Sequence, residues 1–112
     1  MVDSSILSVV TDYLKAINSA DIHADQAVLF GSQVRGDAHP FSDIDLIVIA
    51  PEFDEPRDEK LIDRLWEARA WTDPRIEPIP CGERQWLEDD SSAIIEIARR
   101  EGKVIELELE PA

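Results

Sequence analysis

The stretch "LFGSQVRGDAHPFSDIDLIVIA", Leu29 to Ala50, decides the fold of this protein. One apolar run ends at Gly31-Ser32, and the ten residues 33–42 separate it from a second run that begins with Asp43-Ile44-Asp45. The second run is unbroken and rich in β-branched side chains, which predicts a central strand buried on both faces. The sequence therefore sets two carboxylates at the start of a buried strand.

The spacing of these two carboxylates predicts a metal site. Side chains alternate across a strand, so Asp43 and Asp45 share a face and repel each other unless cations lie between them. Mg²⁺ is usually bound by one or two carboxylates together with phosphate oxygens of a substrate. Two Mg²⁺ ions at such a site can stabilise both the attacking and the leaving oxygen in phosphoryl chemistry.

The Gly31-Ser32 pair predicts a place for the phosphates. It ends the first predicted strand, residues 27–30, and opens a turn or short helix over residues 32–36. Glycine lets a ligand approach the backbone closely, and free N–H groups at a helix start favour phosphate. The hydroxyl of Ser32 adds one more donor. A phosphate-binding turn and a metal-binding pair thus lie on adjoining strands.

Two other charged residues are candidates for this site. Glu77 is the one acid on the third predicted strand, "RIEPIP" at residues 75–80, and we expect it to be the third acid. Arg35 lies one helical turn after Gly31 and could meet a phosphate oxygen, pair with Asp37 or brace Asp43. The sequence leaves these roles of Arg35 open.

The remaining pattern alternates helices with strands. Capping residues and helical spacing of apolar residues predict helices over residues 3–17, 58–71, 83–88 and 91–101. The helix over 58–71 is expected to bury one apolar side, made of Leu61, Ile62, Leu65, Trp66 and Ala70. The third strand contains two prolines, which cannot donate to a ladder, so we expect it at an edge of the sheet.

This order of elements predicts a single small α/β domain over residues 1–112, with a mixed three-stranded sheet flanked by helices. The tail, residues 103–112, is acidic and is expected to form a final strand or a tail. Its alternation of apolar and acidic residues over 104–110 also suits a strip that docks on a partner. Trp86, in polar surroundings, is a second candidate contact because tryptophan is enriched at interface hot spots.

Charge and composition narrow the class of partner. The 112 residues carry a formal net charge of −14, which repels phosphate backbones and argues against direct binding of nucleic acid. A basic protein partner or bound cations suit such a surface. The single cysteine excludes an internal disulfide. The sequence shows neither a secretory signal nor an apolar span for a membrane, so we expect a cytoplasmic protein.

The central motif also resembles that of a known family. Gly31-Ser32, ten residues and then Asp43-Ile44-Asp45 are similar to the signature of the DNA polymerase beta-like nucleotidyltransferases. Together with Arg35-Gly36 they resemble most the minimal nucleotidyltransferases (MNT), small proteins encoded beside HEPN-domain ribonuclease toxins. The resemblance implies a nucleotidyltransferase fold, ATP as substrate, Mg²⁺ as cofactor and an antitoxin that transfers AMP to a tyrosine of the HEPN toxin.

Carried over residue by residue, the resemblance makes Asp43 and Asp45 metal ligands and places the triphosphate at Gly31 and Ser32. It makes Glu77 the third acid and a further metal ligand, beside the metal that activates the attacking hydroxyl. Two alternatives remain open at this stage. One is a catalytically inactive MNT-type module that masks the toxin by contact. The other is a small-molecule nucleotidyltransferase similar to those that modify aminoglycosides, although their additional helical domain exceeds what 112 residues accommodate.

Overall fold

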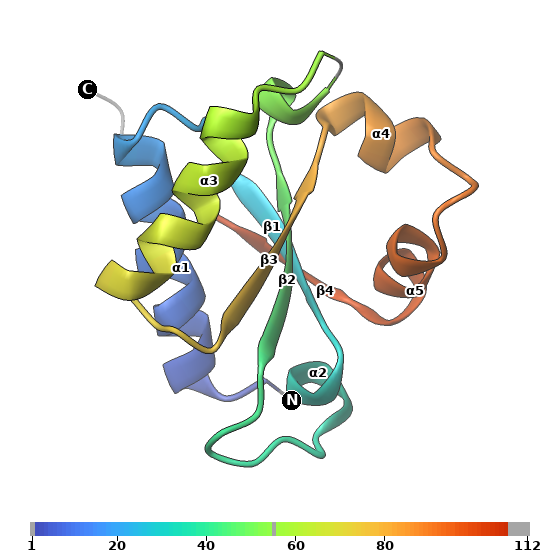
Figure 1. The fold of residues 1–112 in the computed structure, drawn as a ribbon. Coiled ribbons are helices and arrows are strands. Elements are labelled where there is room, and N and C mark those ends of the chain that lie inside the picture. The colour runs from blue at the N-terminus through green and yellow to red at the C-terminus, as the bar shows by residue number, and fades with distance from the viewer. Residues whose placement is uncertain (1, 55, 108–112) are drawn as a thin grey trace.

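Four strands form one mixed sheet in the order β3-β2-β1-β4 (Figure 1). The computed structural model describes residues 2–54 and 56–107. Strand β1 runs antiparallel to both β2 and β4, and β2 runs parallel to β3. The elements in chain order are α1 (Ser4–Ser19), β1 (Gln26–Phe30), α2 (Ser32–Arg35), β2 (Ile44–Ile49), η1 (Pro51–Phe53), α3 (Glu59–Ala68), η2 (Arg69–Trp71), β3 (Ile76–Cys81), α4 (Glu83–Glu88), α5 (Ala93–Glu101) and β4 (Lys103–Glu106).

The prediction of a small α/β domain with a mixed sheet flanked by helices is confirmed, but the number of strands is wrong. Strand β4 is a fourth strand, and it pairs with the side of β1 that β2 leaves free. The alternation in the tail supports this pairing, because Ile105 turns into the core while its neighbours stay exposed. Leu107 continues the connection by donating its N–H to the carbonyl of Asp25. Residues 108–110 of the predicted strip lie outside the described residues.

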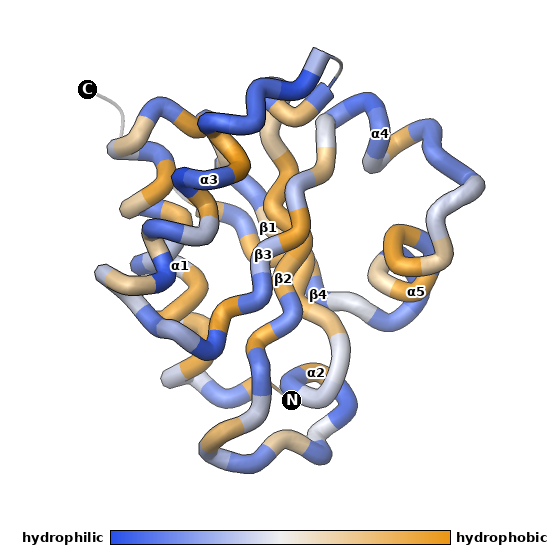
Figure 2. Tube along the Cα trace, viewed as in Figure 1, coloured by the Kyte–Doolittle hydropathy of each residue, from blue (hydrophilic) through white to orange (hydrophobic). Residues whose placement is uncertain are grey.

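Strand β2 is buried on both faces, as predicted, and its residues alternate between two hydrophobic clusters. Ile44, Leu46 and Val48 belong to the larger cluster, which also contains the buried side of α1 and two residues of α3. Ile47 and Ile49 belong to a smaller cluster, closed by residues of α5 and by one side chain of α4. Figure 1 shows α1 and α3 on one side of the sheet and α4 and α5 on the other. Figure 2 shows the hydrophobic residues concentrated along the strands between them.

Local signals set most element boundaries. Asp3, Asp58 and Ser92 cap their helices by accepting a hydrogen bond from a backbone N–H in the first turn. Strand β3 lies at an edge, where the two prolines cost no ladder hydrogen bond. No helix in the described part of the chain is long and apolar enough to cross a membrane.

The predicted apolar side of the helix over 58–71 is partly wrong. The α-helix ends at Ala68 and continues as the short 3₁₀ turn η2. Leu65 and Ala68 are buried, and Leu61 and Ile62 are half-buried against the larger cluster. Of the other predicted members, Trp66 is 42% exposed and Ala70 is also exposed. The stripe that meets the core therefore follows the spacing i, i+3, and Trp66 falls just outside it.

Candidate functional site

The turn after β1 is built on a conformation that only glycine adopts readily. Gly31 has φ +77° and ψ −150°, a region essentially closed to other residues. A β-carbon built on Gly31 would lie 2.4 Å from Oδ2 of Asp45. The carboxylate of Asp45 therefore occupies the space beside the Gly31 backbone. The sequence predicts that a phosphate approaches the backbone of Gly31 closely. In the folded protein, the carboxylate of Asp45 also lies close to this backbone.

The predicted acids come from three neighbouring positions in the fold. In the register of the sheet, Asp45 of β2 stands between Phe30 of β1 and Glu77 of β3. Asp43 directly precedes β2, two residues before Asp45, and so continues the same face. Asp43 is exposed, and Asp45 and Glu77 are half-buried. Sequence spacing predicts that Asp43 and Asp45 share a face, and the parallel pairing of β2 with β3 brings Glu77 to the same end of the sheet.

The charges of these acids act on one another. Burial raises the pKa of Asp45, and the negative charges of Asp43 and Glu77 raise it further. Arg35 acts in the opposite direction and lowers the pKa of Asp45. We define Asp43, Asp45 and Glu77 as the acid cluster. Its unfavourable mutual repulsion is the electrostatic condition that a bound cation relieves.

The acid cluster fits a cation that completes its coordination with other oxygens. Within residues 2–54 and 56–107, no three His, Cys, Asp or Glu side chains converge closely enough to hold a metal ion by themselves. Mg²⁺ does not require such a cage, since it usually takes one or two carboxylates and completes its shell with water and substrate phosphate oxygens. Asp43 and Asp45 supply the hard oxygen donors that this mode of binding needs.

The phosphate-binding turn predicted at residues 32–36 is the short helix α2. The N–H groups of Val34 and Arg35 both donate to the carbonyl of Gly31, at 3.1 Å, so the chain turns immediately after β1. Nε of Arg35 lies 3.5 Å from Oδ2 of Asp37, and both side chains are more than half exposed. Of the three roles left open for Arg35, the ion pair with Asp37 is therefore present. An exposed ion pair of this kind contributes little to stability, so breaking it costs little.

One residue near the acid cluster carried no signal in the sequence. Gln33, in α2, is the buried polar side chain of the described chain, with 9% exposure, and its Nε2 donates to the backbone carbonyl of Asp43 at 3.3 Å. Glutamine in a turn is ordinary, so only the packing of α2 against β2 shows this contact.

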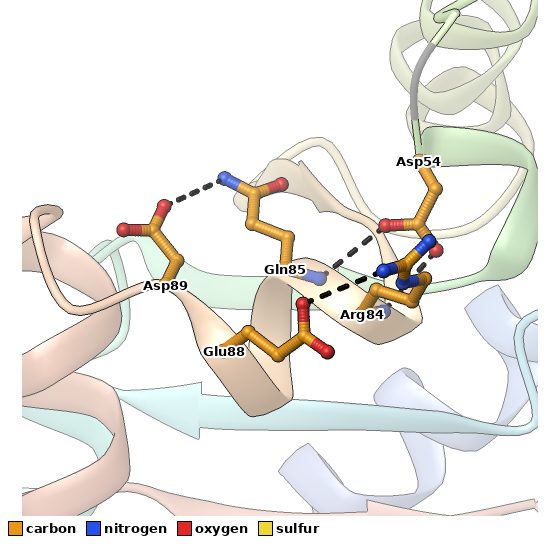
Figure 3. Close-up of a pocket in the computed structure, with 5 residues that line it drawn as sticks. All are labelled: Asp54, Arg84, Gln85, Glu88 and Asp89. Carbon is orange, nitrogen blue, oxygen red and sulfur yellow. Dashed lines mark hydrogen bonds and ion pairs between the residues drawn. The ribbon is translucent and has the colours of Figure 1, made fainter.

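A polar hollow lies at the opposite end of β2 from the acid cluster, after the strand has ended (Figure 3). It has a volume of about 370 Å³ and is lined by Asp54, Arg84, Gln85, Glu88 and Asp89. Its polar groups are largely occupied with one another: Asp54 accepts from the backbone N–H groups of Arg84 and Gln85, and so caps α4. We interpret this hollow as the junction between η1 and α4.

Trp86, the predicted partner anchor, is half-buried. Its ring packs against the smaller cluster, and the guanidinium of Arg99 lies 5.4 Å from the ring centroid. Arg99 also donates to the carbonyl of Trp86, so this residue connects α4 with α5. A contact between Trp86 and a partner stays a prediction.

The chain is similar in sequence or in fold to several known proteins. Residues 10–100 match the family model described as "Nucleotidyltransferase domain". The fold resembles a crystal structure from Sulfolobus solfataricus that is provisionally named a nucleotidyltransferase, with TM-score 0.51 and 21% identity over 70% of this chain and 68% of that one. It also resembles a toxin–antitoxin crystallised with AMP-PNP, with TM-score 0.54 and 22% identity over 88% of this chain and 73% of that one. No curated protein matches the sequence. At these identities the structural likeness speaks for the fold alone.

Proposed function

This chain belongs to the nucleotidyltransferase domain family, and on that premise we propose that it transfers AMP from ATP to a tyrosine of a partner HEPN-domain toxin and so neutralises it. The observation that carries the proposal is the contact between the Asp45 carboxylate and the Gly31 turn, at the centre of the acid cluster. This proximity supports the proposal that the predicted metal-binding and phosphate-binding parts form one site.

Each residue of the site has a role in this proposal. Asp43 and Asp45 would hold Mg²⁺, and Glu77, as the third acid, would help to hold the metal nearest the attacking hydroxyl. When bound, Mg²⁺ neutralises charge on the phosphates and on the attacking oxygen. The turn at Gly31 and Ser32 holds the triphosphate, and Arg35 exchanges Asp37 for a phosphate oxygen.

Transfer of AMP requires that the reacting groups are positioned and that their negative charge is compensated. The tyrosine oxygen forms a bond to the α-phosphorus of ATP, the bond to the β-phosphate breaks, and pyrophosphate leaves. The proton of the hydroxyl goes to a carboxylate of the acid cluster. Phosphoryl transfer of this kind depends almost entirely on in-line placement and on electrostatic stabilisation. The half-buried Asp45 and Glu77, fixed by the sheet, are suited to such placement.

Two observations support a toxin as partner. One of the similar structures is a toxin–antitoxin with AMP-PNP, a non-hydrolysable analogue of ATP. The formal net charge of −14 also complements the basic surface that an RNA-cleaving enzyme presents to its substrate.

A second candidate function is masking of the toxin by contact without catalysis. It requires no bound metal, and the formal net charge of −14 supports contact with a basic toxin equally well. If the protein acts in this way, the acid cluster takes no part in catalysis, and binding alone silences the toxin.

Intact mass spectrometry of the toxin distinguishes the two functions. The purified HEPN partner is incubated with ATP, Mg²⁺ and this protein, and an increase by one or more AMP units is expected. Asp43→Asn and Glu77→Gln should abolish the increase and leave co-purification with the toxin intact. Asp63→Asn removes an equal charge from an exposed position on α3 and serves as the control. If the wild type neutralises the toxin without adding mass, the masking function is correct and the transfer function is wrong.

A further inference from the structure

The peptide group that joins Asp43 to Ile44 is held from two sides. Its carbonyl oxygen accepts a hydrogen bond from Nε2 of Gln33 in α2, at 3.3 Å. Its N–H donates to the carbonyl of Arg75, immediately before β3, at 2.8 Å. Arg75 is itself fixed by Asp73, whose carboxylate lies 2.7 Å from the guanidinium. One peptide unit is therefore anchored on one side to α2 and on the other to the residue that precedes β3.

The two aspartates differ in how the fold holds them. Asp45 lies inside β2, and its backbone is paired with Phe30 on one side and Glu77 on the other. Asp43 precedes the strand, and its side chain is exposed. No side-chain hydrogen bond or ion pair of Asp43 is present within the described residues. The position of its carboxylate therefore depends on the peptide group that follows it.

Gln33 is well placed to set that position. Its side chain is only 9% exposed, and a buried amide is costly unless it is hydrogen-bonded, so the contact with Asp43 is maintained rather than exchanged with water. Gln33 is also the second residue after Gly31, on the helix that begins at the predicted triphosphate site. A displacement of α2 on binding phosphate would be transmitted to the Asp43 backbone through this one hydrogen bond.

We propose that Gln33 is a positioning residue, which sets the Asp43 carboxylate for Mg²⁺ and connects the metal-binding and triphosphate-binding parts of the site. This inference rests on the proposed function, since it assigns Asp43 to the metal. Mg²⁺ demands near-ideal octahedral geometry, so small displacements of a ligand are costly. Residues that orient metal ligands typically change metal affinity by about 10–100-fold when they are replaced.

The test measures binding of Mn²⁺, in place of Mg²⁺, to the full chain by calorimetry, with and without AMP-PNP. Gln33→Met keeps the length and most of the volume of the side chain and removes the donor. Asn18→Leu is the matched control, because Asn18 also donates its amide to backbone carbonyls, those of Leu14 and Ala24, but at the far end of α1. Asp45→Asn is the reference for loss of the metal. Thermal unfolding of each variant accompanies the titrations, and Gln33→Asn replaces Gln33→Met if the latter does not fold.

We expect Mn²⁺ to bind Gln33→Met about tenfold more weakly than the wild type, in the range typical of residues that orient ligands. Asn18→Leu should lose a similar amount of thermal stability and bind Mn²⁺ as the wild type does. If Gln33→Met binds Mn²⁺ with the same affinity as the wild type while Asp45→Asn does not bind it, the role of Gln33 is wrong. The assignment of the metal site is then still supported. Equal weakening in Gln33→Met and Asn18→Leu would overturn it too, because general destabilisation then accounts for the effect. If the wild type binds no Mn²⁺ even with AMP-PNP, the proposed function itself is wrong and the inference is withdrawn with it.

Discussion

The carboxylate of Asp45 fills the space in which a side chain of Gly31 would begin. A β-carbon at residue 31 would lie 2.4 Å from Oδ2 and 3.4 Å from Cγ of Asp45. The absence of a side chain at one residue is therefore what allows the acid of the adjoining strand to stand beside the turn. Gly31 therefore makes room for one member of the acid cluster, in addition to supplying the backbone conformation of the turn.

Replacing Gly31 tests this relationship directly. Gly31→Ala should destabilise the protein by more than the roughly 1–3 kcal/mol that a residue in a forbidden backbone region costs, because the new methyl also collides with Asp45. Gly36→Ala is the matched control: Gly36 has φ +88°, but among the described residues, apart from its own chain neighbours, no atom lies within 4 Å of its would-be β-carbon. That control should lose only about 1–2 kcal/mol, the cost of the left-handed conformation. Urea unfolding measures both, and equal losses would show that the collision with Asp45 is relieved without cost.

Removing the charge of Asp45 should stabilise the protein in the absence of metal. Burial and the charges of Asp43 and Glu77 raise the pKa of Asp45 above its ordinary value of 3.8, so the folded state binds this proton more tightly than the unfolded state does. The stability associated with the protonated form is present at low pH and is lost as the pH rises through the raised pKa. At pH 7 the ionised carboxylate is therefore a net cost, and Asp45→Asn should raise the Tm by a few degrees.

This effect has a defined pH dependence and a metal dependence. The difference in Tm between Asp45→Asn and the wild type should shrink as the pH falls through the raised pKa and vanish below 3.8. Mg²⁺ should raise the Tm of the wild type, by mass action, and leave that of the variant unchanged. Calorimetric scans across pH, with and without Mg²⁺, measure both. A lower Tm for the variant at pH 7 would mean that the Asp45 charge is compensated within the fold.

From the position of β4 in the sheet we expect different losses of stability when two adjacent residues are replaced. Ile105 is 8% exposed and packs into the larger cluster, whereas Val104 is 49% exposed. Ile105→Ala should cost about 2–5 kcal/mol, as for other buried aliphatic side chains, because it leaves a cavity beside β1. Val104→Ala should change the free energy of unfolding by no more than about 0.5 kcal/mol. Similar, small changes in both variants would argue against β4 as a strand of the sheet.

The tryptophans provide a further pair of contrasting variants. Trp86 packs on the smaller cluster with Arg99 over its ring, so Trp86→Ala should cost about 1–3 kcal/mol. Trp71 is 84% exposed, and Trp71→Ala should stay within about 0.5 kcal/mol of the wild type. Denaturant unfolding followed by circular dichroism compares the two without relying on tryptophan fluorescence. A larger loss in Trp71→Ala would contradict the arrangement of η2.

Much of the site could be predicted from the sequence because its residues lie close together in the chain. Gly31-Ser32 and the pair Asp43 and Asp45 are separated by a single connection, and strand alternation alone puts the two acids on one face. Glu77 was found by a weaker argument, as the acid of the next strand, and the parallel register of β2 with β3 sets it opposite Asp45. Gln33 gave no signal, since nothing local shows that its side chain turns inward.

The sequence by itself determined the order and type of most elements, that β2 is buried on both faces, and that a strand with two prolines lies at an edge. These properties follow from backbone propensity, periodicity and capping, which act over a few residues. Only the tertiary structure decided that β4 pairs with β1, that Ala68 rather than Trp66 meets the core, and that Asp45 lies against Gly31. Each of these depends on which surfaces distant in the chain pack together. A local pattern shows that one side of a helix is apolar or that the edge of a strand can pair. The packing of the whole chain decides which distant residues cover that side or pair with that edge.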